Sequence, residues 1–288
     1  AHEHFHVFNV KRMRPVELWR LDYEVENYTP LLWVAEGFTA YYDDLLCRRA
    51  GVLSVTKYLQ VVADGIADAH KTPGRLVHPL AEASYDAWIK FYRPDEDTKN
   101  SSQSYYGNGG LAAMCFDIEI RRQTRGARGL DHAMAQLWNA TYVAGRGFTH
   151  ADVVAALTDA AGYDMSAMVD GLVRGPFDPD LAGALRSMGL LLEAVKPSSD
   201  SPGFLGIQFQ AGSTVLATVQ RGGPGARGGL AAGDEVIAVG GVRVTAGSFD
   251  EILHAASQPG RPVAVLLARR GLMLERHVAP DGREARIS

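Results

Sequence analysis

The chain has 288 residues, of which 47% are hydrophobic, and it carries a formal net charge of −4 with acidic and basic residues interspersed. This length and composition predict a protein that buries a substantial core and divides into two domains. The charge gives no reason to expect a nucleic-acid partner, and no apolar run approaches the roughly 20 residues of a membrane span.

The first motif is the pentapeptide His2-Glu3-His4-Phe5-His6, which has the form HExxH. Residues four apart lie on one face of an α-helix, so His2 and His6 can aim imidazole nitrogens at one zinc ion. Glu3 would then take a proton from water that the zinc activates. The alternative is a surface helix that carries three histidines by chance. A third ligand would decide between the two.

Glu36 is the candidate third ligand, in a helix that we predict from Leu31 to Arg49. Thr29 is placed to cap this helix, Pro30 to occupy its first position and Gly51 to end it. A glutamate among so many apolar neighbours would be costly to bury unpaired, and coordination of a cation removes that cost. The alternative is a glutamate on the solvated side of the helix.

Asp43 follows Glu36 on the same helix face, two turns further along. It is placed to accept a hydrogen bond from the second nitrogen of a zinc-bound histidine, an arrangement that is common around metal ligands. The alternative is that Asp43 and Asp44 are simply solvated.

The pattern of the chain up to residue 195 predicts one mainly helical domain. Ser54 is placed to cap a helix whose apolar residues recur at helical spacing. Residues 70–100 are rich in proline and aromatic residues and predict a long irregular loop. Four residues there either form a substrate wall or pack beneath the loop: Trp88, Phe91, Tyr92 and Arg93. Later helices are predicted to begin at Tyr106, to be capped by Asp131 and Thr149, and to span 165–173 and 181–192.

The two cysteines, Cys47 and Cys115, lie in predicted helices among apolar residues. We expect both to be buried thiols, because two cysteines do not form a disulfide framework.

The composition changes after residue 195. Residues 196–203 are rich in serine and proline and predict a linker. Beyond it, short β-rich runs separated by glycines predict a second domain over 204–288. The predicted strands are 204–209, 214–219, 235–239 and 262–268, and a short amphipathic helix is predicted over 248–256.

Three segments resemble the catalytic domain of the glycyl aminopeptidases: HEHFHVFNVKRMRP (2–15), LLWVAEGFTAYYDDLL (31–46) and SYYGNGGLAAMCFDIEIR (104–121). These enzymes are gluzincins, zinc peptidases distantly similar to aminopeptidase N. The resemblance implies a mainly helical catalytic domain that corresponds to the C-terminal part of a thermolysin-like zincin fold. It makes His2, His6 and Glu36 the ligands of one Zn²⁺ per chain, with Glu3 as the general base.

The resemblance also singles out Tyr106. In this family and its aminopeptidase N relatives, a tyrosine followed by x-Lys-Gly points its hydroxyl at the scissile carbonyl. Zinc and a phenol on opposite sides of the forming oxyanion would stabilise it. The adjacent Tyr105 is the alternative, and Asn108 stands where the family has lysine.

The resemblance further implies that a β-rich N-terminal domain and the first part of the catalytic domain precede residue 1. We therefore expect the chain to be a fragment. The implied portion includes the acidic segment that recognises the free amino terminus of the substrate.

Residues 222–244 resemble the corresponding stretch of bacterial PDZ domains. In that resemblance Leu205, Gly206 and Ile207 match the carboxylate-binding loop, and the helix with Ile252 forms the other wall of the groove. A peptide or protein C-terminus would add there as an extra strand. The alternative is a structural PDZ domain whose groove is unused.

The sequence thus predicts a multidomain α + β protein, a gluzincin domain followed by a PDZ domain. The predicted function is a zinc-dependent aminopeptidase that cleaves peptides after small N-terminal residues such as Gly or Ala. The alternative is a non-catalytic PDZ scaffold with an inactive peptidase-like domain. The compartment is open between the bacterial cytoplasm and the periplasm, and we favour the periplasm.

Overall fold

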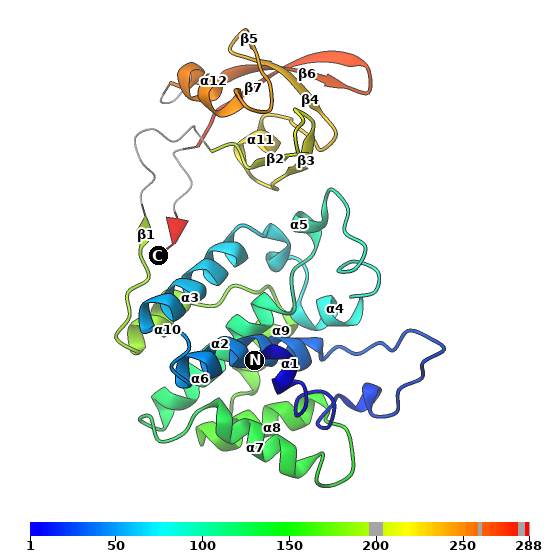
Figure 1. Cartoon of the computed structure of the whole chain (residues 1–288), viewed down its shortest axis with the longest axis vertical. Coiled ribbons are helices and arrows are strands. Elements are labelled where there is room, and N and C mark those ends of the chain that lie inside the picture. The colour runs from blue at the N-terminus through cyan, green and yellow to red at the C-terminus, as the bar shows by residue number, and fades with distance from the viewer. Residues whose placement is uncertain (196–203, 259–260, 282–285, 288) are drawn as a thin grey trace. The chain divides into compact units, whose positions relative to one another are not determined.

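The computed structural model describes residues 1–195, 204–258, 261–281 and 286–287, so the predicted linker over 196–203 lies outside the described residues. The chain forms two compact units, one of residues 1–93 and 102–193 and the other of residues 94–101 and 194–287 (Figure 1). The first is helical and the second is rich in β-strands, which confirms the predicted α + β multidomain class.

The first unit consists of helices of varied length joined by loops. They are α1 (His2–Phe5), η1 (Val16–Leu18), η2 (Trp33–Phe38), α2 (Thr39–Arg49), α3 (Val55–His70), η3 (Pro73–Leu76), α4 (Leu80–Tyr85), α6 (Gly107–Gln123), α7 (Leu130–Ala140), α8 (His150–Ala161), α9 (Ser166–Arg174) and α10 (Leu181–Ser187). Within the described part of the chain, no helix combines the length and the apolar character needed to cross a lipid bilayer.

Helix α6 lies at the centre of the first unit. It packs against η2, α2, α3, α8 and α10, and most of its residues are buried. The rings of Trp33, Phe38 and Phe116 join η2 to α6, with centroids 5.6, 6.2 and 6.4 Å apart. η2, which carries Glu36, is therefore fixed against α6, which begins directly after Tyr106.

The predicted helix from Leu31 to Arg49 is two elements in the structure. η2 is a π-helix, which α2 continues, and single π-turns of this kind are frequent at functional sites. Gly51 follows the end of α2 with a φ of +77°, as predicted for a terminating glycine. At the other end, Thr29 Oγ1 accepts a hydrogen bond from Leu31 N at 3.2 Å.

Of the other three predicted caps, those at Ser54 and Thr149 are confirmed. Ser54 Oγ accepts a hydrogen bond from Lys57 N at the start of α3, at 3.1 Å. Thr149 and Asp152 cap α8 reciprocally, with each side chain accepting from the backbone N–H of the other.

The prediction for Asp131 is wrong, because α7 begins after Gly129. The N–H of Leu130 donates to Asp117 Oδ1 at 2.6 Å, so a carboxylate of α6 caps α7 instead. Asp131 accepts a hydrogen bond from the Tyr42 hydroxyl and forms an ion pair with Arg49.

Other expectations need smaller corrections. The predicted loop over 70–100 contains the short helices η3, α4 and α5 (Thr98–Ser101). The helix predicted over 181–192 ends at Ser187, and Gly189 follows it with a φ of +79°. Cys115 is buried as expected, whereas Cys47 is half-buried.

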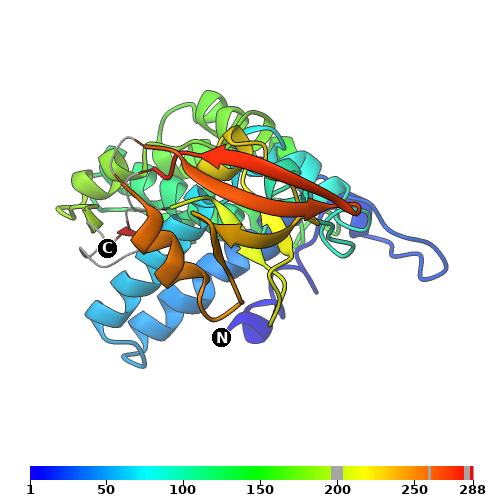
Figure 2. The same ribbon diagram turned by 90° about the horizontal axis from the view of Figure 1, so that it is seen from above.

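The second unit contains α5 and the β-rich part of the chain. Its remaining elements are β1 (Ala194–Val195), β2 (Ile207–Phe209), β3 (Leu216–Val219), α11 (Pro224–Arg227), β4 (Glu235–Val239), β5 (Val242–Arg243), α12 (Phe249–Ala256), β6 (Val263–Arg269), β7 (Leu272–Val278) and β8 (Arg286–Ile287). The strands pair in the orders β1-β8, β2-β3 and β5-β4-β6-β7, all antiparallel. Figure 2 shows β6 and β7, in orange and red, side by side as the longest hairpin.

Residues 94–101, which the sequence places between two parts of the helical domain, belong to this second unit. Asn100 is 7% exposed and supplies the attachment. Its Nδ2 donates to Val219 O at 2.8 Å, and its Oδ1 accepts from Arg221 N at 2.7 Å. One side chain thus satisfies two backbone groups at the end of β3.

Candidate active site

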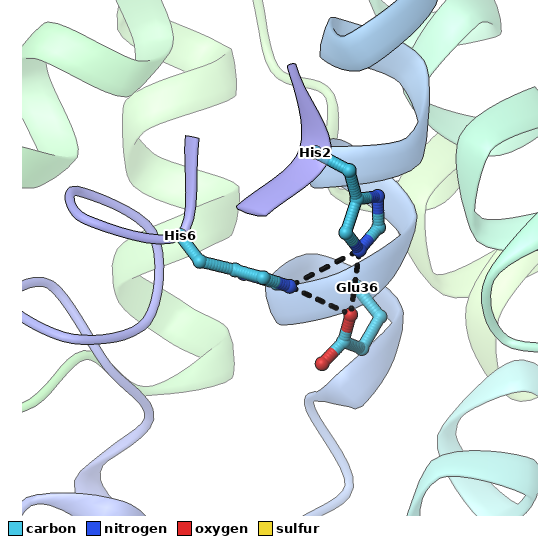
Figure 3. A group of neighbouring side chains, drawn as sticks. All are labelled: His2, His6 and Glu36. Carbon is cyan, nitrogen blue, oxygen red and sulfur yellow. Dashed lines mark hydrogen bonds and ion pairs between the residues drawn. The ribbon is translucent and has the colours of Figure 1, made fainter. Parts of the chain in front are cut away.

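The side chains of His2, His6 and Glu36 converge on one point (Figure 3). The two Nε2 atoms are 3.1 Å apart, and Glu36 Oε2 lies 3.5 Å from His2 Nε2 and 3.2 Å from His6 Nε2. α1 is a single helical turn, in which the N–H of His6 bonds to His2 O at 3.2 Å, and this turn sets both rings on one side. The structure therefore brings together the three residues that the sequence predicts as ligands.

The three atoms fit a zinc ion in spacing and in chemistry. Two ligands of a tetrahedral zinc ion with bonds of about 2.0–2.2 Å lie roughly 3.3–3.6 Å from each other, close to the separations found here. Glu36 Oε2 is also buried without a hydrogen-bond partner in the described chain. A buried carboxylate oxygen that faces two imidazole nitrogens and lacks a donor is well suited to hold a cation.

Each histidine is oriented by a hydrogen bond from its other ring nitrogen. His2 Nδ1 lies 3.0 Å from Asp43 Oδ2, and His6 Nδ1 lies 2.8 Å from Asn9 O. Because both acceptors are oxygens, the ring protons belong on the Nδ1 atoms, which leaves each Nε2 with a free lone pair. This tautomer is the one that a metal ligand requires.

Asn9 is a site residue that the sequence reasoning missed. It is fully buried, and its Nδ2 donates to Val34 O at 2.9 Å and to Ala35 O at 3.2 Å. Its side chain therefore holds η2 while its carbonyl holds His6, so one residue links two predicted ligands. The only sequence signal for this role is a small polar residue three positions after His6.

The backbones of η2 and α6 touch at Gly37 and Gly109. A Cβ added to Gly37 would lie 2.6 Å from the Cα and the carbonyl carbon of Gly109, and 2.9 Å from Tyr105 O. Only glycine permits such an approach. Because Glu36 directly precedes Gly37, and Tyr106 lies less than one turn before Gly109, this contact sets the tyrosine beside the predicted ligand Glu36.

Tyr106 borders the predicted ligands. Its ring stacks on that of His2 with centroids 6.2 Å apart. Tyr106 is half-buried, whereas Tyr105 is only 1% exposed and is packed inside. Burial and the charge of Glu36 both raise the pKa of Tyr106 above its ordinary value, so its phenol is a hydrogen-bond donor at neutral pH.

Glu3 and Asn108 differ in their exposure to solvent. Glu3 is exposed on α1, between the two histidines in sequence. Asn108 is 5% exposed, and its Nδ2 donates to Gln103 Oε1 at 2.7 Å. The residue that replaces the family's lysine is therefore used inside the fold, to fix the start of α6.

The three residues predicted for the PDZ groove precede and begin β2. Leu205 is buried, Gly206 has a φ of +67°, and Ile207 packs against the same core as Ile252 of α12. No described residue accepts a hydrogen bond from the backbone N–H of Leu205 or Gly206. Groups of this kind are what a peptide carboxylate binds.

Comparison with known families identifies both parts. Residues 1–112 match the family model of the M61 glycyl aminopeptidases, and residues 215–270 match that of a PDZ domain. The chain carries an M61 glycyl aminopeptidase domain and a PDZ domain. The M61 match includes His2, His6, Glu36 and Tyr106. No curated protein matches the sequence.

One solved structure resembles the chain over its whole length. The crystal structure of an aminopeptidase N family protein from Idiomarina loihiensis superposes with a TM-score of 0.89 at 27% sequence identity. The match covers 100% of this chain and 51% of that protein, so the chain spans about half its length. A serine endoprotease from Yersinia pestis matches over 29% of this chain and 30% of that one at 23% identity. Its TM-score of 0.26 is too low to indicate a shared fold.

Proposed function

We propose that the chain is a zinc-dependent aminopeptidase that cleaves peptides after a small N-terminal residue, glycine or alanine. The observation that carries the proposal is the triangle of His2 Nε2, His6 Nε2 and Glu36 Oε2, with a buried oxygen that has no donor. The M61 match supports the peptidase class, and the preference for small residues comes from that family alone.

His2, His6 and Glu36 would hold the metal. Zinc in such a site supplies Lewis-acid chemistry that makes water a nucleophile at neutral pH. Asp43 and Asn9 O keep the two rings in the ligand tautomer, so they fix the direction of the Nε2 lone pairs.

Glu3 and Tyr106 would carry the proton chemistry. Glu3 accepts the proton of the attacking water and then delivers it to the departing amine. Tyr106 donates a hydrogen bond to the oxygen of the scissile carbonyl as negative charge develops there. Since its ring is stacked on His2, the phenol is held beside the ligands before substrate arrives.

The first test is the zinc content per chain, measured by elemental analysis. We expect about one zinc per chain, largely lost in Glu36→Ala and retained in Glu24→Ala, a control at an exposed glutamate. Equal zinc content in Glu36→Ala and the unmodified chain would contradict the predicted ligand set.

The second test is hydrolysis of glycyl-, alanyl- and leucyl-p-nitroanilide. We expect the glycyl and alanyl substrates to be preferred. Tyr106→Phe should lower turnover about a hundredfold, whereas Tyr105→Phe should not, because Tyr105 is packed inside the fold. A greater loss in Tyr105→Phe would show that Tyr105, not Tyr106, is the oxyanion donor.

The PDZ domain implies a second, peptide-binding function. We propose that it binds a peptide C-terminus at Leu205, Gly206 and Ile207, and that binding is lost when the terminal carboxylate is amidated. Fluorescence polarisation with paired free and amidated peptides tests this. Peptide binding without zinc or hydrolysis would favour a scaffold over an enzyme.

A further inference from the structure

A pocket of about 320 Å³ in the M61 domain is lined by residues that the proposed chemistry does not use. We name it the aromatic pocket, and its lining residues are Glu26, Tyr28, Trp88, Ile89, Tyr92 and Arg93. Its four large apolar side chains are 36–62% exposed. Large apolar side chains that gather around an open pocket, rather than in the core, are typical of a ligand-binding surface.

The pocket is built from two segments that are far apart in sequence. Trp88 Nε1 donates to Asn27 O at 3.5 Å, and the rings of Tyr28 and Tyr85 lie 5.3 Å apart. These contacts join residues 26–28 to residues 85–93. The pocket is therefore formed before any ligand enters it.

One wall of the aromatic pocket, formed by Tyr92, lies near Tyr106, the proposed oxyanion donor. Tyr92 lies close enough to Tyr105 and Tyr106 to contribute to the raised pKa of both phenols. Phe91 adds a second link, because its ring lies 5.7 Å from that of Tyr106. Within the pocket lining, the rings of Trp88 and Tyr92 lie 6.1 Å apart. Because the ring of Phe91 also lies 5.3 Å from that of Tyr92, one side chain links the pocket lining to Tyr106.

We propose that the aromatic pocket holds the side chain of the substrate residue on the carboxyl side of the scissile bond, and that it selects a large apolar or aromatic residue there. The inference rests on the proposed function. Glycine or alanine before the scissile bond has no side chain that could fill about 320 Å³, so the first side chain able to do so follows the bond. Glu26 and Arg93 contribute one charge of each sign, so selection is by apolar area rather than by charge.

The test compares the tripeptides Gly-Phe-Gly and Gly-Ala-Gly, which differ only in the side chain assigned to the pocket. We expect kcat/KM to favour Gly-Phe-Gly by about tenfold or more, the range for burial of one aromatic side chain. Trp88→Ala should reduce this ratio to about threefold or less, mainly through KM, while Trp88→Phe keeps most of it. Val143→Ala, at a residue that is 65% exposed and outside the pocket, should leave the ratio unchanged.

Binding measurements separate this inference from the proposed function. Calorimetric titration of both tripeptides into Glu3→Gln, with and without Trp88→Ala, reports the pocket without hydrolysis. A preference for Gly-Phe-Gly that depends on Trp88, together with an unmodified chain that hydrolyses neither peptide, supports the pocket and refutes the peptidase. Hydrolysis and binding that are equal for the two peptides overturn the pocket and leave the peptidase standing.

A structural role for Trp88 is a further outcome that would overturn the inference. In that case Trp88→Ala would lower the kcat/KM of both tripeptides equally. If Trp88→Ala fails to fold, Ile89→Ala, at a residue that is 62% exposed, replaces it in the same comparison.

Discussion

Replacement of Gly37 by alanine should disturb both the stability of the helical unit and the position of Tyr106. The added Cβ would lie 2.6 Å from the Gly109 backbone, about 0.8 Å short of the 3.4 Å at which ordinary contact begins. Both partners are backbone, so no side chain can rotate away. Overpacking of this kind costs about 1–3 kcal/mol, against about 1 kcal/mol gained from the higher helix propensity of alanine.

We expect a net loss of up to about 2 kcal/mol in the free energy of unfolding, which corresponds to a fall in Tm of up to roughly 8 °C for a unit of this size. The effect on turnover should be larger. Relief of the clash separates η2 from α6 by a sizeable fraction of an ångström, and a 1 Å misplacement can cost about a hundredfold in rate. Thermal denaturation and hydrolysis of alanyl-p-nitroanilide measure the two effects.

Gly65→Ala is the matched control, because it makes the same chemical change within α3 where a Cβ would meet nothing within 4 Å. It should stabilise the unit by up to about 1 kcal/mol and leave turnover unchanged. If Gly37→Ala were as stable and as active as the unmodified chain, the close approach of the two helices would not be what positions Tyr106.

Three further perturbations test the site and the loop near it. Asp43→Ala should weaken zinc binding about 10–100-fold, and Asp44→Ala should not, in competition with a chelator of known affinity. Asn9→Ala should cost about 1–3 kcal/mol in urea denaturation, because buried carbonyls lose their donor; a loss below about 0.5 kcal/mol would contradict this. Burial lowers the pKa of His78 below its usual 6.5, so the unfolded chain binds that proton more readily. Stability should therefore fall as the pH drops below about 6.5, and His78→Gln should flatten this part of the profile, unlike replacement of the exposed His70.

The sequence predicts the parts of the site that depend on spacing along one helix or on local capping. The four-residue interval between His2 and His6 determines that both rings face the same way, and the cap at Ser54 follows from one side chain and its neighbours. Such features depend on a few consecutive residues, so they can be read without knowledge of the fold.

The features that the sequence does not reveal depend on contacts between distant segments. Asp131 looks like a cap, but Asp117 on another helix supplies the acceptor. Gly37 and Gly109 matter only because two backbones meet there. Strand β7 was missed because most of its side chains are exposed, so it lacks the apolar pattern of a buried strand.

The attachment of residues 94–101 to the second unit has a consequence for the order of folding and for truncation. Asn100 is bonded to residues 119 and 121 positions further along the chain, so this part of the unit cannot close until most of the polypeptide has been synthesised. A chain that stops at residue 193 would leave the amide of Asn100 without its partners, and one that starts at residue 194 would leave the end of β3 without Asn100. The β-rich unit therefore depends on residues 94–101, and a fusion of this unit to another protein should include them.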